Sequence, residues 1–286
     1  LALSDGRTLA YCEWGDPEGH PVFYAHGGPG SRLEGEFFDQ KARDYGFRLI
    51  ATDRPGMGRS TFLPGRTLLG YPKDLLELAG SLEIDTFGVL GWSGGGAHTT
   101  VCGYAIPERL SFNIPLCGYT NFAELPGAAG MLKARLDQIS VGLSQSRPRL
   151  FQLFFDLMKL SIDRFPGTFK KSLLDSVNDT DRKLLEDPAL MEQFMADQKE
   201  AVIQGGRGVA VDAAVHYVDW GFRLAEISGR VDIFHGTDDY LVPFAYARHL
   251  ADNIPQAELH AIEDQGHLFP IDHQDLIFET ARARIN

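Results

Sequence analysis

The residue of this sequence best suited to nucleophilic chemistry is a serine between glycines. Gly91-Trp92-Ser93-Gly94-Gly95 fits the pattern G-x-S-x-G, between an expected strand at 86–90 and an expected helix that begins near Gly94. A serine on a tight strand-to-helix turn presents its hydroxyl to a substrate, and the turn leaves room only for small neighbours. A phosphate loop would need Gly-Lys-Ser/Thr here, and a dinucleotide fingerprint would need a glycine in place of the serine. The pattern therefore predicts that Ser93 is a nucleophile.

A second glycine cluster predicts where negative charge would be held. His26-Gly27-Gly28-Pro29-Gly30 follows directly after an expected strand at 21–25. When a nucleophile attacks a carbonyl, the oxygen becomes an anion, which backbone N–H groups stabilise best where no side chain obstructs them. We predict that the N–H groups of Gly28 and Gly94 form this oxyanion hole. His26 is expected to hold the loop by hydrogen bonds and not to move protons.

The elements that must position these residues alternate along the chain. Strands are expected at 8–14, 21–25, 47–52, 86–90 and 112–116, with amphipathic helices at 32–45 and 71–82. The pattern resumes with a strand at 231–235, a helix at 244–253, a strand at 258–263 and a last helix at 272–284. Strands separated by helices predict the α/β class, with a mostly parallel central sheet flanked by helices.

The middle of the chain, at 119–218, has a different character. It has almost no β-run, and prolines divide it into segments of helical period, which predicts an all-helical insertion. In one segment apolar residues recur at spacings of three and four, which predicts a helix with a broad apolar stripe: Phe151, Phe154, Phe155, Met158 and Ile162. Such a stripe either packs on neighbouring helices or lines a ligand cavity, and it can do both.

Three further motifs accompany the two glycine clusters. They are Asp53-Arg54-Pro55-Gly56-Met57-Gly58-Arg59-Ser60, then His235-Gly236-Thr237-Asp238-Asp239 with Val242-Pro243, and Gln265-Gly266-His267. With these motifs in this order, nearly the whole chain resembles the α/β-hydrolase fold family, in its serine hydrolase branch. The resemblance implies a serine–acid–histidine triad in that chain order and a cap domain over the active site. We therefore expect a hydrolase core at 1–118 and 219–286, with the cap at 119–218.

His267 is the best candidate for the general base of that triad. It lies in a Gly-His turn after the last expected strand, whereas His260 lies inside a strand, His273 inside a helix, and His235 and His98 in apolar runs typical of core histidines. For the acid, Asp239 matches the family position, and the adjacent Asp238 is its rival. The predicted triad is Ser93, Asp239 and His267.

Composition limits the classes of partner. The chain has 286 residues, 44% of them hydrophobic, and a formal net charge of −12, which is the wrong sign for a surface that binds nucleic acid. The longest stretch without charged residues, 86–107, is too rich in glycine for a membrane helix. Cys12, Cys102 and Cys117 have no C-x-x-C spacing, so neither a zinc site nor a disulfide framework is expected. We expect a soluble, cytoplasmic protein without a cofactor or metal, and the oligomeric state stays open.

The function expected from these features is hydrolysis of a small-molecule ester or lactone by a carboxylesterase-like serine hydrolase. Trp92, Phe151, Phe154, Phe155 and Met158 are the expected substrate-binding residues. The His-Gly-Gly-Pro-Gly loop resembles that of proline iminopeptidases, so an aminopeptidase is an alternative. However, the chain has no tryptophan between Trp92 and Trp220 for the Trp-Glu pair of that family's cap. A small-ligand receptor on the same fold is the other alternative, because an intact triad serves both.

Overall fold

A mostly parallel sheet runs through the centre of the molecule in the computed structural model, which describes residues 1–285. Across that range seven strands pair in the order β1-β3-β2-β4-β5-β6-β7, and β1 alone is antiparallel to its neighbour. The strands are β1 Tyr11–Gly15, β2 His20–Ala25, β3 Phe47–Thr52, β4 Phe87–Trp92, β5 Leu110–Leu116, β6 Val231–Gly236 and β7 Ala257–Ile262. The parallel α/β sheet predicted from the sequence is confirmed.

The strand order reverses direction between β2 and β4. From β2 the chain continues to β3 on one side, whereas from β4 it continues to β5 on the other. Loops at such a switch point diverge and leave a crevice at the carboxyl ends of the strands, where open α/β sheets bind ligands. The His26–Gly30 loop and the Ser93 turn both begin at this crevice, because they directly follow β2 and β4.

Helices cover both faces of the sheet and bury its apolar side chains. One face packs against α1 Asp39–Asp44 and α13 Gln274–Ile285, through residues such as Phe38, Phe47 and Phe278. The other face packs against α2 Tyr71–Ser81, α3 Gly94–Ala105 and α11 Phe244–Asn253. Every residue of β4 is buried, as expected for a central strand covered on both sides.

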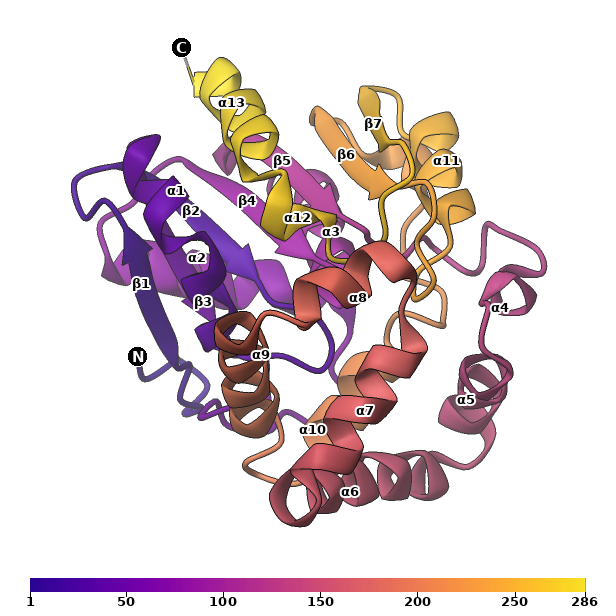
Figure 1. The fold of residues 1–286 in the computed structure, drawn as a ribbon. Coiled ribbons are helices and arrows are strands. Elements are labelled where there is room, and N and C mark those ends of the chain that lie inside the picture. Colours follow the sequence, from indigo (N-terminus) through magenta and orange to yellow (C-terminus); the bar gives the residue numbers. More distant parts are fainter. Residues whose placement is uncertain (286) are drawn as a thin grey trace.

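A run of helices between β5 and β6 forms the insertion. Its members are α4 Ala128–Met131, α5 Arg135–Ser146, α6 Pro148–Arg164, α7 Pro166–Ser176, α8 Asp179–Leu185, α9 Pro188–Ala201 and α10 Gly206–Ala214. In Figure 1, α4 and α5 lie at the right, α6, α7 and α10 toward the bottom, and α8 and α9 nearer the centre. Prolines open α6, α7 and α9, where a missing N–H costs nothing. Within residues 1–285, none of the helices combines the length and hydropathy needed to cross a bilayer.

Two expected helices differ from the observed ones. The segment expected as one helix at 32–45 is a 3-10 helix over Arg32–Phe38 followed by α1. Gly35 lies so close to Trp14 that a Cβ there would be 2.6 Å from Trp14 Cδ1, and glycine weakens an α-helix. The last expected helix, at 272–284, is observed as α13, which begins at Gln274 after a short preceding helix, α12 Phe269–Asp272. His273, expected inside a helix, stands between the two, so that expectation was wrong.

The contact between α10 and the loop after β3 generates a stability prediction. A Cβ added at Gly208 would lie 2.0 Å from the Gly56 carbonyl oxygen, so Gly208→Ala must push α10 away from the core. Overpacking of this kind costs about 1–3 kcal/mol. We predict a loss of that size in the free energy of unfolding, measured by urea denaturation.

Gly142 on α5 provides the matched control. A Cβ at Gly142 meets no atom within 4 Å, so Gly142→Ala should leave stability unchanged or raise it by up to about 1 kcal/mol. Equal stability of the two variants would contradict the close packing of α10 on Gly56.

Candidate active site

The backbone turn at Ser93 has the strained geometry that the glycine pattern predicts. Ser93 has φ 56° and ψ −118°, a conformation that side-chain-bearing residues rarely adopt. Its N–H donates to Leu116 O at 2.8 Å and its carbonyl accepts from Gly96 N at 2.9 Å. A Cβ at Gly95 would lie 1.9 Å from Ala25 O, which explains why glycine follows. The serine therefore stands between β4 and the start of α3, at the carboxyl edge of the sheet.

The two glycines expected to form the oxyanion hole lie together beside this turn. A Cβ added at Gly94 would lie 3.5 Å from Gly28 N, and a Cβ added at Gly27 would lie 3.6 Å from Ser93 Cβ. Gly28 and Gly94 both border the same cavity as Ser93. The geometry is compatible with two backbone N–H groups meeting one oxygen, and their catalytic role stays a prediction.

Buried polar side chains hold the His26–Gly30 loop. Gly27 N donates to Glu34 Oε1 at 2.7 Å, and Arg54 donates through Nη2 to Gly27 O at 2.8 Å and through Nη1 to His26 O. His26 is fully buried, and its Nε2 accepts from Arg54 N at 3.2 Å. These contacts agree with the expected structural role of His26. Glu34 was not anticipated from the sequence.

His267 and Asp239 form a direct pair. The His267 Nδ1 lies 2.7 Å from Asp239 Oδ2, while Asp239 Oδ1 accepts from the backbone N–H groups of Leu241 and Val242 at 2.8 and 2.9 Å. Asp238 instead faces Lys133, 3.4 Å away, with its side chain 51% exposed. The geometry thus favours Asp239 as the partner of His267.

The charges of the pair stabilise each other. Burial disfavours protonated His267, but the surrounding carboxylates, Asp239 foremost, outweigh burial and raise the pKa of His267 above its ordinary 6.5. Burial also works against ionised Asp239, yet the neighbouring His267 and His235 hold its pKa well below 3.8. A histidine held in this way keeps its Nε2 available to accept a proton.

The loop that carries His267 is fixed from two sides. Asp181, on α8 of the insertion, accepts from the backbone N–H groups of His267 and Leu268, each at 2.8 Å. Trp92 Nε1 donates to His267 O at 3.0 Å, and the two rings stack with centroids 6.0 Å apart. Within residues 1–285 no hydrogen bond joins the Ser93 hydroxyl to His267, a contact that often forms only when substrate enters.

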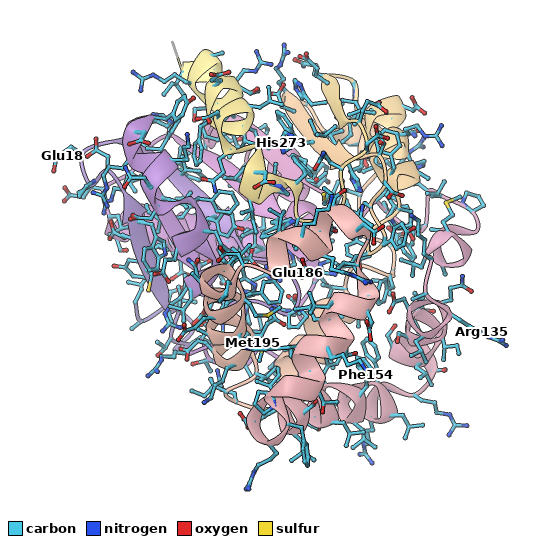
Figure 2. The ribbon with its side chains drawn as sticks, in the orientation of Figure 1. Glu18, Arg135, Phe154, Glu186, Met195 and His273 are labelled. Atoms are coloured by element: carbon cyan, nitrogen blue, oxygen red, sulfur yellow. The ribbon has the colours of Figure 1, made fainter. Side chains whose placement is uncertain are left out.

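One cavity of about 300 Å³ unites these groups. Ser93, Gly28, Gly94 and His267 line it, and the insertion completes its wall. All the side chains expected to bind substrate contribute: Trp92, Phe151, Phe154, Phe155 and Met158. The apolar stripe of α6 also packs on α10, since Phe151 and Phe155 are buried together with Val209 and Ala210. Phe154, in contrast, is 51% exposed. Figure 2 labels Phe154 on α6 and Met195 on α9 among the side chains of the insertion.

Buried charge borders the cavity as well. Asp212 on α10 lies 2.6 Å from Arg54 Nη2 and also pairs with Arg66, and all three side chains are at least 95% buried. Glu34 lies in the cavity wall, and burial raises its pKa to about 7. Asp197 on α9 accepts from Ser31 N at 2.8 Å, and burial beside Glu34 raises its pKa well above 3.8. Periodicity could not identify Asp197 and Asp212, because their partners lie more than 150 positions away along the chain.

Two groups of side chains have the composition of a metal site. Cys117, Asp239 and His267 bring ligand-type atoms within 4.8 Å of one another, as do Asp232, Glu258 and His260. In the first group His267 Nδ1 is paired with Asp239, and burial raises the pKa of Cys117 so that the thiol keeps its proton. In the second, the carboxylates pair with Arg230 and Arg284. Neither donor set is arranged to prefer a cation over the partners it already has.

Known proteins share this architecture. A family profile described as the alpha/beta hydrolase fold matches residues 20–274. A proline iminopeptidase from Arabidopsis thaliana is 31% identical over 117 residues, covering 39% of this chain and 30% of that protein. Non-heme chloroperoxidase CPO-A1 from Kitasatospora aureofaciens is 26% identical over 272 residues, covering 92% and 90%.

The solved structure of esterase EaEST from Exiguobacterium antarcticum is similar with a TM-score of 0.70 and 20% identity, covering 100% of this chain and 98% of that one. This likeness agrees with the observed fold. Because the family profile spans most of the sequence, the chain belongs to the alpha/beta hydrolase fold family.

Proposed function

We propose that this protein is a serine hydrolase that cleaves small, uncharged esters or lactones through an acyl-enzyme. The observation that carries the proposal is one cavity bordered by Ser93 on its strained turn, by Gly28 and Gly94, and by the His267 ring paired with Asp239. Nucleophile, base and oxyanion donors around a single space are the parts that acyl transfer needs.

In the proposed mechanism, His267 Nε2 takes the hydroxyl proton as Ser93 Oγ attacks the substrate carbonyl. The carbonyl oxygen becomes an anion between the Gly28 and Gly94 N–H groups. Protonated His267, stabilised by Asp239, then gives its proton to the leaving alcohol. Water, activated by the same histidine, attacks the acyl-enzyme and frees Ser93.

The cavity supports a preference for apolar acyl or alcohol groups. Its insertion side is formed mainly by aromatic and aliphatic side chains, among them Phe151, Phe155 and Met158. A net charge of −12 and the nearby carboxyl of Glu34 disfavour anionic substrates.

An aminopeptidase is the second candidate. Glu34 offers a carboxyl group in the cavity wall that could meet a substrate ammonium, and one local relative is named as a proline iminopeptidase. Assaying nitrophenyl esters, lactones and proline naphthylamide side by side separates the two candidates. Steady release of many product equivalents supports an enzyme, whereas one slow turnover with a large thermal shift supports a receptor.

Our prediction for Ser93 uses a fluorophosphonate probe. The probe should label the wild-type protein, and Ser93→Ala should lose both labelling and ester turnover because the attacking hydroxyl is gone. Ser144→Ala is the control: this buried serine on α5 donates to Val141 O and should be labelled as the wild type is. Undiminished labelling of Ser93→Ala at another serine would refute the assignment.

The acid is tested by exchanging carboxylate for amide at two adjacent positions. Asp239→Asn should lower kcat by about 10⁴, because the histidine loses its orientation and charge partner. The base works when neutral, so a raised pKa places the acid limb of the wild-type pH–rate profile above pH 6.5. Without the Asp239 charge that limb should move to lower pH.

Asp238→Asn serves as the matched control and should retain both the rate and the position of the limb. If Asp238→Asn were the crippled variant, the two roles would have to be exchanged.

The contribution of the insertion to specificity is tested on α6. Phe155→Leu and Met158→Leu should shift the ester chain length at which kcat/KM is highest. Each methylene that gains or loses its place in the pocket should change the activation free energy by about 1–3 kcal/mol. Leu157→Met, a similar exchange at a side chain that is 56% exposed on the same helix, should leave the optimum in place. A uniform change across all esters that tracks lost stability would count against a pocket role.

A further inference from the structure

His216 lines the catalytic cavity and has a buried ring nitrogen without a partner. Within residues 1–285 its Nε2 makes no hydrogen bond, and the side chain is 2% exposed. Leaving a buried polar atom unpaired destabilises the folded state, so each such atom in a native structure calls for an explanation. The proposed mechanism, with its two backbone donors, gives this nitrogen no task.

The position of His216 points to a role beside the predicted oxyanion hole. His216 follows the carboxyl end of α10 and lines the same cavity as Ser93 and Gly28. A Cβ added at Gly94 would lie 3.5 Å from His216 Nε2 and 3.5 Å from Gly28 N. The imidazole and the glycine amide therefore border one small space, next to the residue that follows the nucleophile.

Two other rings pack against the imidazole of His216. It stacks on Tyr119 with centroids 5.0 Å apart and an interplanar angle of 5°, and it meets the edge of His98 at 5.4 Å. His98 Nδ1 lies 2.9 Å from Gly94 O, and the backbone of Gly94 also lies close enough to His216 to act on its pKa. Donors fixed before the reaction stabilise developing charge without reorganisation.

The ring is neutral at physiological pH. Burial lowers the pKa of His216 to about 4, and Arg54 and Arg66 add to this effect against the opposing charge of Asp212. A neutral imidazole carries one N–H, which can donate to an oxyanion without releasing its proton. A neutral histidine with a lowered pKa can polarise a carbonyl in this way.

We propose that His216 Nε2–H is a third donor to the substrate carbonyl oxygen, beside the N–H groups of Gly28 and Gly94. The proton stays on Nε2 throughout, and the hydrogen bond strengthens as the oxygen becomes an anion. The inference rests on the proposed hydrolase function. It makes the insertion part of the oxyanion hole, because His216 reaches the site through α10.

The experiment compares wild type, His216→Phe and His216→Gln. Phenylalanine keeps a flat ring against Tyr119 and removes the donor, whereas glutamine restores an N–H. Loss of one oxyanion donor typically lowers kcat by about 10²–10³-fold. We expect a fall of that size in kcat and in the rate of fluorophosphonate labelling for His216→Phe, with KM and the His267 pH limb unchanged. His216→Gln should recover part of the loss.

His249→Phe is the control, since this partly buried histidine bonds to Thr120 Oγ1 at 2.8 Å. It should label at the wild-type rate. Thermal melting verifies that each variant is folded.

A second readout does not depend on a folded His216→Phe protein. In the wild type, binding of phenylboronic acid to Ser93 creates a tetrahedral anion, and the Nε2–H of His216 should move downfield in nitrogen-15 NMR spectra. An unchanged His216 signal in the boronate adduct would overturn the inference.

The outcomes separate the inference from the proposed function. If neither probe reacts with Ser93 in the wild type, the serine hydrolase proposal fails, and the inference fails with it. If the wild type reacts and His216→Phe reacts equally fast, only the third donor is overturned. Equal loss in His216→Phe and His216→Gln would likewise reject donation.

Discussion

The Arg54 guanidinium is fully buried, and the site depends on how its charge is satisfied. Arg54 donates to the carbonyls of His26 and Gly27, which fixes the loop that carries Gly28, and it pairs with Asp212 from α10. A buried cation without its partner strongly destabilises a protein, so the core requires α10 in this position. Once α10 is docked by Asp212, His216 is carried into the cavity. One buried ion pair thus couples the glycine loop of the core to the insertion.

The sheet supplies the second constraint. Because strand order reverses between β2 and β4, the loop after β2 and the turn after β4 leave the sheet side by side. The two segments approach so closely that a Cβ at Gly95 would lie 1.9 Å from Ala25 O and 2.7 Å from His26 O. The turn after β4 therefore requires glycine at position 95, next to Ser93 with its positive φ of 56°.

Residues of the candidate site could be predicted from the sequence where a short local motif marks them. Ser93 and Gly28 follow strands in short glycine-rich turns, and His267 follows the last strand, so pattern and family resemblance predict them, and the structure brings all three to one cavity. The α/β sheet and the helical insertion also follow from local periodicity. Element ends were less predictable, as the division of the 32–45 segment shows, because close packing of Gly35 on Trp14 is a tertiary effect.

Glu34, Asp181, Asp212 and His216 could not be found in this way. Each acts on a residue that lies far from it in sequence or in another layer, as when Asp181 binds the backbone of His267. A lone acid on an amphipathic helix gives the same signal whether it faces solvent or a buried partner. Only the packed structure distinguishes the two cases.

Three carboxyl groups of the insertion each bind a different loop of the core. Asp181 accepts from the His267 loop, Asp197 from Ser31 beside the glycine loop, and Asp212 from Arg54. Their pKa values shift in opposite directions, since burial raises the pKa of Asp197 while Arg54 and Arg66 keep the pKa of Asp212 well below 3.8 despite burial. Asp197 binds the uncharged N–H and hydroxyl of Ser31, whereas Asp212 binds two cations.

Through these contacts the insertion supports loops of the core in addition to lining the cavity. The loops of Gly28 and His267 belong to the core, but each takes part of its support from α8, α9 or α10. The apolar stripe of α6 carries none of these carboxyls, but its Phe151 and Phe155 pack directly on Val209 and Ala210 of α10, the helix that carries Asp212. The helix that shapes the cavity wall is therefore in contact with the helix that holds the proposed catalytic groups, so a change of side-chain volume on α6 can reach the reaction geometry through α10.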